Sequence, residues 1–124
     1  MCGFLGERIY KSVGLTDKAI FMKILELSKQ RGPDSTGYYS NNKNIQLGFN
    51  RLAVQDLTNN ASQPIQSPST QYTMVFNGEI YNHFELRKEI SNYNHQFIGN
   101  GDTESLIACF DYLGIIETVK KLNG

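Results

Sequence analysis

Several features are missing from this chain, and their absence narrows its possible functions. It carries no net charge, with 12 Lys and Arg residues against 12 Asp and Glu residues, and its longest basic runs are the pairs Arg87-Lys88 and Lys120-Lys121. This balance argues against a general attraction to nucleic acid or acidic lipid. No apolar run reaches the roughly 18 residues that a transmembrane helix needs. The chain also lacks internal repeats and low-complexity tracts.

Cysteine is scarce, and no export signal accompanies it. The start of the chain does not resemble a signal peptide, because the charged pair Glu7-Arg8 interrupts it before an apolar stretch can develop. Only Cys2 and Cys109 are present, far apart in sequence. These observations predict a reducing, cytoplasmic location without a disulfide framework. Cys109 lies in an apolar stretch and is expected to be a core thiol.

The 124 residues suffice for one domain with one core. Apolar spacing and turn residues predict both strands and helices, which come in runs and do not alternate strictly. This order favours an α+β fold with mainly antiparallel sheets over a doubly wound parallel sheet. The expected strands are Cys2–Leu5, Thr36–Ser40, Ile45–Phe49, Arg51–Leu57 and Tyr72–Phe76, and an exposed loop is expected at Asn59–Thr70.

Three helices are expected. The first spans Asp17–Lys29, with Thr16 as N-cap and a buried face formed by Ile20, Ile24 and Leu27 and flanked by Phe21 and Leu25. The second opens at Asn82 with a capping-box pattern and runs toward Ser91. The third opens at Asp102 and buries Leu106, Ile107, Phe110 and Leu113.

The residue with the clearest chemical potential is Cys2. Removal of Met1 would leave a thiol and a free α-amino group on one residue, and an amine with a reference pKa near ~8 can accept the thiol proton. Cys2 would then be a nucleophile that carries its own base and attacks an acyl carbon. The tripeptide Met1-Cys2-Gly3 taken alone favours an accidental start over a functional one.

Other candidate residues also have a purely structural interpretation. Asn77-Gly78 is a strong hairpin signal, but it could also supply a side-chain amide and a backbone N–H to a tetrahedral oxyanion. Arg51 could be a solvated charge at a strand end or could bind a substrate carboxylate. Asp102 could cap a helix or face an ammonium group, and Arg31–Asp34 could simply be a turn that stops a helix.

Together, these motifs resemble a known family. In order along the chain they are Met1–Gly6, Arg31–Asp34, Arg51–Val54, Phe76–Asn82 and Gly101–Glu104. The set resembles the class II glutamine amidotransferase domain of glutamine-hydrolysing asparagine synthetases, a branch of the N-terminal-nucleophile hydrolases. The resemblance runs from the first residue to the last. Related sugar-phosphate and phosphoribosyl amidotransferases share the Cys-first chemistry, but Glu79-Ile80-Tyr81-Asn82 favours the asparagine-synthetase branch.

The resemblance implies an αββα architecture, with two antiparallel sheets between helical layers. It also implies roles for individual residues in the hydrolysis of L-glutamine to glutamate and ammonia. Cys2 would attack the side-chain amide, and Asn77 with the Gly78 N–H would hold the oxyanion. Arg51 would bind the α-carboxylate of glutamine and Asp102 its α-ammonium group. Val54, Gln55 and Glu79 would line the pocket.

The resemblance further implies that glutamine hydrolysis needs no metal or cofactor. Ammonia would pass to a synthetase domain or chain, where ATP and Mg²⁺ activate an aspartate carboxylate. That domain is not in residues 1–124, and relatives continue after a turn like Leu122-Asn123-Gly124 with further strands of the amidotransferase domain. We therefore expect a partial domain with an unpaired sheet edge and an exposed apolar face.

Two hypotheses from different classes follow for residues 1–124. The chain is either a glutaminase domain that supplies ammonia, or an inactive, truncated remnant that acts only by binding a partner or glutamine. Small departures from the family pattern, Gln30 and Phe49-Asn50, are expected to tune the surroundings of the pocket without abolishing binding.

Overall fold

The computed structural model describes residues 2–10, 13–54 and 58–124. The chain divides into two units. The N-terminal unit comprises Met1–Val54 with Ser62–Pro64, and the C-terminal unit comprises Gln55–Ala61 with Ile65–Gly124. Among the described residues, no helix combines the length and the apolar character needed to cross a membrane.

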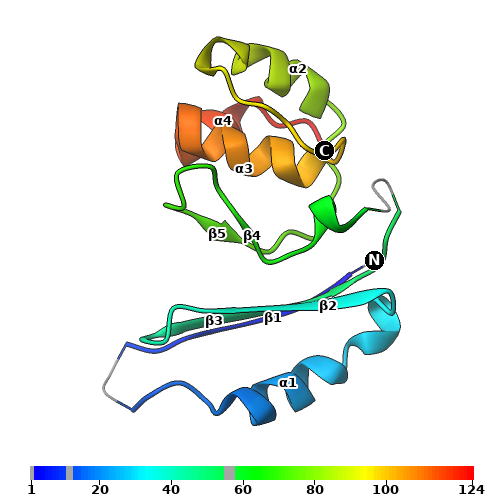
Figure 1. Ribbon diagram of the computed structural model, residues 1–124, viewed down its shortest axis with the longest axis vertical. Coiled ribbons are helices and arrows are strands. Elements are labelled where there is room, and N and C mark those ends of the chain that lie inside the picture. Colours follow the sequence, from blue (N-terminus) through cyan, green and yellow to red (C-terminus); the bar gives the residue numbers. More distant parts are fainter. Residues whose placement is uncertain (1, 11–12, 55–57) are drawn as a thin grey trace. The chain divides into compact units, whose positions relative to one another are not determined.

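The N-terminal unit is built on an antiparallel sheet with the strand order β1-β3-β2 (Figure 1). The strands are β1 (Gly3–Arg8), β2 (Ser35–Ser40) and β3 (Ile45–Arg51). The three expected strands in this region are confirmed, with boundaries that differ by up to three residues. β3 lies in the centre, with Gly3 opposite Asn50 on one side and Ser35 opposite Arg51 on the other.

The expected strand Arg51–Leu57 is wrong over the part that the structure describes. β3 ends at Arg51, and the next three residues are irregular, while residues 55–57 lie outside the described part of the chain. The Ala53 backbone N–H donates to the Asp34 carboxylate at 2.7 Å. A strand that continued through Ala53 would need this N–H for a hydrogen bond to a neighbouring strand. The Asp34 side chain takes the N–H instead, so strand pairing stops here.

Helix α1 (Lys18–Glu26) lies along one face of this sheet (Figure 1), and its boundaries and buried face differ from the prediction. Phe21 and Leu25 are buried, whereas Ile20, Ile24 and Leu27 are exposed. The N-cap is Asp17, whose carboxylate accepts the Ala19 N–H at 2.9 Å. Thr16 is not the cap because its hydroxyl donates to the Glu7 carboxylate at 2.8 Å.

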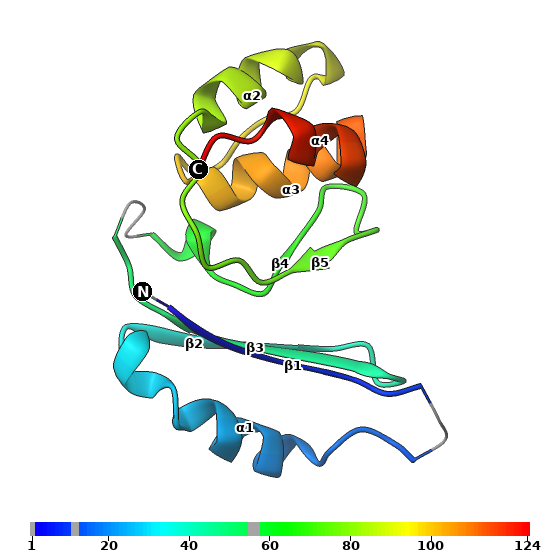
Figure 2. The same cartoon turned by 180° about the vertical axis from the view of Figure 1, so that it is seen from behind.

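The C-terminal unit contains a two-stranded antiparallel sheet and three α-helices (Figure 2). They are β4 (Ile65–Gln66), β5 (Thr73–Met74), α2 (His83–Glu89), α3 (Asp102–Leu113) and α4 (Ile115–Lys121). Short 3₁₀ turns occur in the chain at Lys29–Arg31, Asn59–Ala61 and Ser91–Tyr93. The buried core of this unit comprises Ile80, Leu86, Ile90, Leu106, Ala108 and Cys109.

The expected helices α2 and α3 are confirmed, but their caps differ from the prediction. The Asn82 side chain makes no capping bond in α2. Its amide donates to the Lys121 carbonyl at 2.8 Å and its oxygen accepts the Asn123 N–H at 3.0 Å, so it ties α2 to the end of α4. The N-cap of α3 is Gly101, so Asp102 is the first helical residue.

Two expectations about the middle of the chain are also wrong. Asn77-Gly78 does not close a hairpin, since Glu79–Tyr81 forms no strand and β5 pairs with β4. The segment Asn59–Thr70 is not a simple exposed loop, because it contains β4 and the buried Ser67. Ser67 donates to the Asp111 carboxylate of α3 at 3.0 Å, which holds this segment in place.

The described elements confirm an α+β fold with antiparallel sheets. The finer expectation of a stacked αββα arrangement stays a prediction from the resemblance.

Candidate functional site

The thiol of Cys2 is held at the end of strand β3. Because β1 and β3 are antiparallel and Gly3 lies opposite Asn50, Cys2 lies beside the residues that follow β3. Its Sγ accepts the Leu52 N–H at 3.3 Å and donates to the Leu52 carbonyl at 3.7 Å. The sulfur is therefore fixed next to the residue after Arg51, and Cys2 remains partly exposed.

The backbone around Cys2 is packed tightly against the turn after α1. A Cβ atom added to Gly3 would lie 2.6 Å from Ser28 Oγ and 2.8 Å from Ser28 Cβ. The Cys2 carbonyl accepts a hydrogen bond from Arg31 Nε at 3.4 Å. Gly3 thus permits a close approach that a side chain would prevent, and Arg31 holds the peptide that carries the thiol.

Arg51 and the loop that follows it are fixed by the Arg31–Asp34 motif. The residue Arg51 is only 8% exposed. Its carbonyl accepts the Asp34 N–H at 3.0 Å, and the Asp34 carboxylate accepts the Ala53 N–H at 2.7 Å. Asp34 is therefore bonded to the backbone on both sides of Leu52, the residue whose N–H and carbonyl contact the thiol. Val54 is 71% exposed, and Gln55 lies outside the described residues.

In the C-terminal unit, the Asn77–Glu79 segment is connected to Asp102 through Ile80. Asn77, Gly78 and Glu79 lie in irregular backbone directly before Ile80. The Ile80 N–H donates to the Asp102 Oδ2 atom at 2.9 Å. A Cβ atom added to Gly78 would lie 2.6 Å from the Phe76 ring, so this backbone also packs closely on its neighbour.

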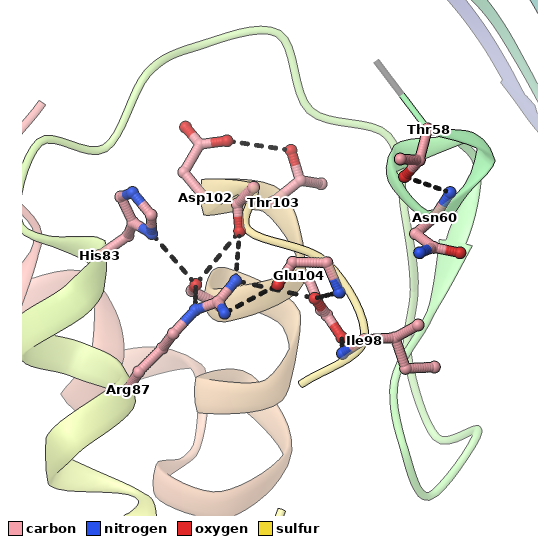
Figure 3. Close-up of polar contacts among 11 residues, drawn as sticks. Thr58, Asn60, His83, Arg87, Ile98, Asp102, Thr103 and Glu104 are labelled. Atoms are coloured by element: carbon pink, nitrogen blue, oxygen red, sulfur yellow. Dashed lines mark hydrogen bonds and ion pairs between the residues drawn. The ribbon is translucent and has the colours of Figure 1, made fainter. Parts of the chain in front are cut away.

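Asp102 is a buried carboxylate, although it does not cap its own helix. It is 7% exposed, and its Oδ1 atom accepts the Thr103 hydroxyl at 3.3 Å (Figure 3). A buried carboxylate in the first turn of α3 is favoured by the helix dipole. The Asp102 carboxyl group therefore lies at the positive end of the α3 dipole.

The side chains near Asp102 include the buried His83 and the partly buried Arg87. The pKa of His83 lies below its usual value, because burial disfavours the cation and the Arg87 charge repels it. His83 is therefore neutral at pH 7. The pKa of Arg87 is also lowered by burial, but its ordinary value is so high that the guanidinium stays protonated.

The second cysteine is chemically different from the first. Cys109 is fully buried in the core of the C-terminal unit, as expected from the sequence. Burial, with a smaller contribution from Glu89, raises the pKa of its thiol to about 11. Cys109 is therefore a structural thiol that stays protonated at neutral pH.

The site residues that the sequence predicted fall into two groups. Cys2, Arg51 and Val54 belong to the N-terminal unit, and the structure brings Cys2 to the end of the strand that carries Arg51. Asn77, Gly78, Glu79 and Asp102 belong to the C-terminal unit, where Ile80 connects the first three to Asp102. Among the described residues, no group of three or more His, Cys, Asp or Glu side chains could hold a metal ion.

Sequence reasoning missed the Leu52 peptide, which contacts the thiol, and the ties from Arg31 and Asp34. The side chain of Leu52 carries no chemical signal, since the contact is made by backbone atoms. Only the register of β1 against β3 could have predicted that Leu52 lies beside the Cys2 thiol.

The whole chain, residues 1–124, matches a family model described as a glutamine amidotransferase domain. The chain belongs to this family. This amidotransferase domain is 35% identical over 128 residues to the glutamine-hydrolyzing asparagine synthetase 1 of Bacillus subtilis (strain 168), an alignment that covers 100% of this chain and 20% of the relative. It is 36% identical over 129 residues to the glutamine-hydrolyzing asparagine synthetase 1 of Arabidopsis thaliana, with the same coverage of 100% and 20%.

A relative with a different name also matches. The amidase chry2 of Gibberella zeae is 33% identical over 92 residues, which cover 73% of this chain and 14% of that protein. The amidotransferase domain thus spans about one fifth of the length of its curated asparagine-synthetase relatives.

Proposed function

We propose that this amidotransferase domain hydrolyses L-glutamine to glutamate and ammonia, with Cys2 as the nucleophile. The observation that carries the proposal is the fixed thiol of Cys2, whose Sγ lies 3.3 Å from the Leu52 nitrogen at the end of the strand that carries Arg51. Removal of Met1 frees the α-amino group, which accepts the thiol proton directly or through a water. The reaction itself then needs no metal or cofactor.

The thiolate attacks the side-chain amide carbon of glutamine. The carbonyl oxygen becomes an oxyanion, and the Asn77 side-chain amide and the Gly78 N–H donate hydrogen bonds to it. The protonated α-amino group gives its proton to the amide nitrogen, the C–N bond breaks and ammonia leaves. Water then hydrolyses the thioester, which releases glutamate and restores Cys2.

The head of glutamine is a zwitterion, which requires one fixed cation and one fixed anion. Arg51 binds the α-carboxylate and Asp102 binds the α-ammonium group, and both residues are less than one tenth exposed, at 8% and 7%. Burial strengthens charge pairing because little water screens it. From the resemblance we further propose that Val54, Gln55 and Glu79 contribute to glutamine binding and that only the neutral amide reaches the thiol.

The released ammonia serves an asparagine-synthetase-type amidation on another domain or chain. This part of the proposal rests on the names of the relatives, of which this chain spans about one fifth. ATP and Mg²⁺ would belong to that synthetase part, where they would activate an aspartate carboxylate. A cytoplasmic location, with abundant glutamine and reducing conditions, suits this chemistry.

The test is the intact mass of the purified chain before and after exposure to a diazo-ketone analogue of glutamine, with the adduct mapped by peptide. Loss of Met1 and one adduct on Cys2 are expected, with excess glutamine slowing the reaction. Cys2→Ser serves as the control that should remain unlabelled. A processed chain that stays unlabelled would overturn the proposal and favour an inactive remnant that binds a partner.

A further inference from the structure

Arg87 is the centre of a buried polar cluster in the C-terminal unit (Figure 3). It lies on α2, and its side chain is 13% exposed. Its three nitrogen atoms donate in different directions: Nε to Ser105 Oγ at 2.7 Å, Nη1 to the Gly99 carbonyl at 2.8 Å and Nη2 to the Gly101 carbonyl at 2.8 Å. The guanidinium therefore holds two carbonyls of the segment that leads into α3.

Glu104 holds the same segment through its backbone N–H groups (Figure 3). Its carboxylate accepts the Ile98 N–H at 2.8 Å and the Gly99 N–H at 2.9 Å. It also pairs with Arg87 at 3.6 Å. Two backbone N–H groups and two carbonyls of residues 98–101 are thus bonded to one ion pair. The Phe97 ring centroid lies 4.0 Å from the guanidinium carbon.

This clamp ends one residue before Asp102. The Gly101 carbonyl is bound by Arg87, and Asp102 begins α3 directly afterwards. The Asp102 carboxylate in turn accepts the Ile80 N–H, three residues after Asn77. Arg87 therefore fixes the backbone position from which the Asp102 side chain extends.

We propose that Arg87 is a positioning residue for glutamine recognition, which fixes the Gly99–Gly101 backbone so that Asp102 meets the α-ammonium group of the substrate. This inference rests on the proposed function. Lysine cannot replace Arg87, because a single ammonium nitrogen cannot reach Ser105 and both carbonyls, which the three guanidinium nitrogens reach separately. Arg87 itself does not touch the substrate.

A purely structural role for Arg87 would affect all substrates equally, whereas a positioning role affects only those with an α-ammonium group. The experiment therefore compares L-glutamine with 5-amino-5-oxopentanoate, which is glutamine without that group. Ammonia release is measured with the full-length natural polypeptide for wild type, Arg87→Lys and Asp102→Asn. Arg8→Lys is the matched control, because Arg8 is exposed in β1, where its guanidinium lies over Tyr10.

We expect Arg87→Lys to lower kcat/KM for glutamine by about 5- to 30-fold, mainly through KM, because displacing a binding group costs at most what its removal costs. The value for the analogue should change by less than about threefold, since uniform binding to the rest of the substrate is kept. Arg8→Lys should change neither value. Equal losses for both substrates, or no loss for glutamine, would overturn the inference.

The failure of this inference is distinguishable from the failure of the proposed function. If wild type releases no ammonia from glutamine, or if Asp102→Asn keeps the full preference for glutamine over the analogue, the proposed function falls and the inference with it. If Asp102→Asn loses the preference and Arg87→Lys keeps it, only the inference falls.

Arg87→Lys could fail to fold, which a missing cooperative thermal transition would reveal. Glu104→Gln then decides the question, because the amide oxygen still accepts a backbone N–H while the charge partner of Arg87 is lost. A loss of preference for glutamine in Glu104→Gln, smaller than in Asp102→Asn, supports the inference. An unchanged preference overturns it.

Discussion

The Asp102 carboxylate accepts the backbone N–H of Ile80 at 2.9 Å, so a side chain proposed to bind substrate also holds the segment that follows Asn77-Gly78. One carboxylate therefore has a structural task and a proposed recognition task. Two substitutions at this position separate the two tasks.

Asp102→Asn should lower kcat/KM for glutamine by roughly 30-fold, which is about 2 kcal/mol of lost charge pairing, while the fold is kept. The amide oxygen of Asn can still accept the Ile80 N–H. Asp102→Ala removes that acceptor as well, and a buried unsatisfied N–H costs about 1–3 kcal/mol of stability. Steady-state kinetics with chemical denaturation would check both effects, and equal stability losses in the two variants would contradict this account.

Changes at the nucleophile should abolish glutamine hydrolysis. Cys2→Ala and Cys2→Ser remove or weaken the attacking atom, and a retained Met1 turns the α-amino group into an amide that cannot act as a base. Each should reduce ammonia release from glutamine on the order of 10³-fold or more. Intact mass confirms the state of Met1 in every sample. Comparable turnover in all three would exclude the proposed mechanism.

Asn77→Ala should affect the chemical step more than binding. If the Asn77 amide donates to the oxyanion, its loss should lower kcat by about 10²-fold and leave KM for glutamine nearly unchanged. Single-turnover measurements of thioester formation would report this step directly. The exposed Asn42 offers a control, and Asn42→Ala should leave kcat unchanged. A rise in KM with normal kcat would instead assign Asn77 to ground-state binding.

The two thiols should differ in their reaction with iodoacetamide. At pH 8 the folded chain should take up one label, on Cys2, because burial and a pKa raised to about 11 keep Cys109 protonated and inaccessible. Cys109 should react only near pH 11 or after denaturation. Peptide mass spectrometry counts the labels at each pH. Equal labelling of both thiols in the folded chain at pH 8 would contradict the buried position of Cys109.

Glu7 should contribute an acid-sensitive part of the stability. The pKa of its carboxyl lies below the usual value, chiefly because the Gln46 amide and then the Thr16 hydroxyl donate to it. A lowered folded pKa means that this contribution is complete above the unfolded pKa of about 4.3 and is lost as the pH falls through the folded value.

Glu7→Gln should therefore lower the midpoint of thermal unfolding at pH 7, and it should make the loss of stability below pH 4.3 shallower than in wild type. Glu26→Gln, at an exposed position of α1, is the control and should keep the wild-type pH profile. Parallel profiles for wild type and Glu7→Gln would show that the Gln46 and Thr16 bonds do not favour the charged carboxylate.

The strands and helices that the sequence predicted well are those with a clear apolar period, but the choice of the buried face was harder. In α1 the helical spacing of Ile20 and Ile24 is as good as that of Phe21 and Leu25. The sheet selects the second pair, because Gly48 on β3 leaves room for their side chains. Local spacing contains no information about which face a sheet will cover.

The caps and turns were predicted less well, because several polar side chains had competing partners far away in sequence. Thr16 binds Glu7 and Asn82 binds the end of α4, and neither contact can be read from local capping patterns. The separate helix α4 was also missed. Gly114, with φ of 82°, ends α3 and lets a new helix begin at the next residue.

The candidate site was predictable at the level of residue types, through motifs that resemble a family. The backbone partners of the thiol were not, since the register of β1 against β3 determines them.

The contact between Gly3 and Ser28 has a consequence for how freely the start of the chain can vary. In a library that tries every residue at each position of β1, position 3 should accept only glycine, because any Cβ atom meets both the Cβ and the Oγ atom of Ser28. Gly6, on the same strand, meets only the tip of the Leu47 side chain at 3.3 Å and should tolerate alanine. Sequence variation next to Cys2 would then be limited by the space between β1 and Ser28, independently of the reaction at the Cys2 thiol.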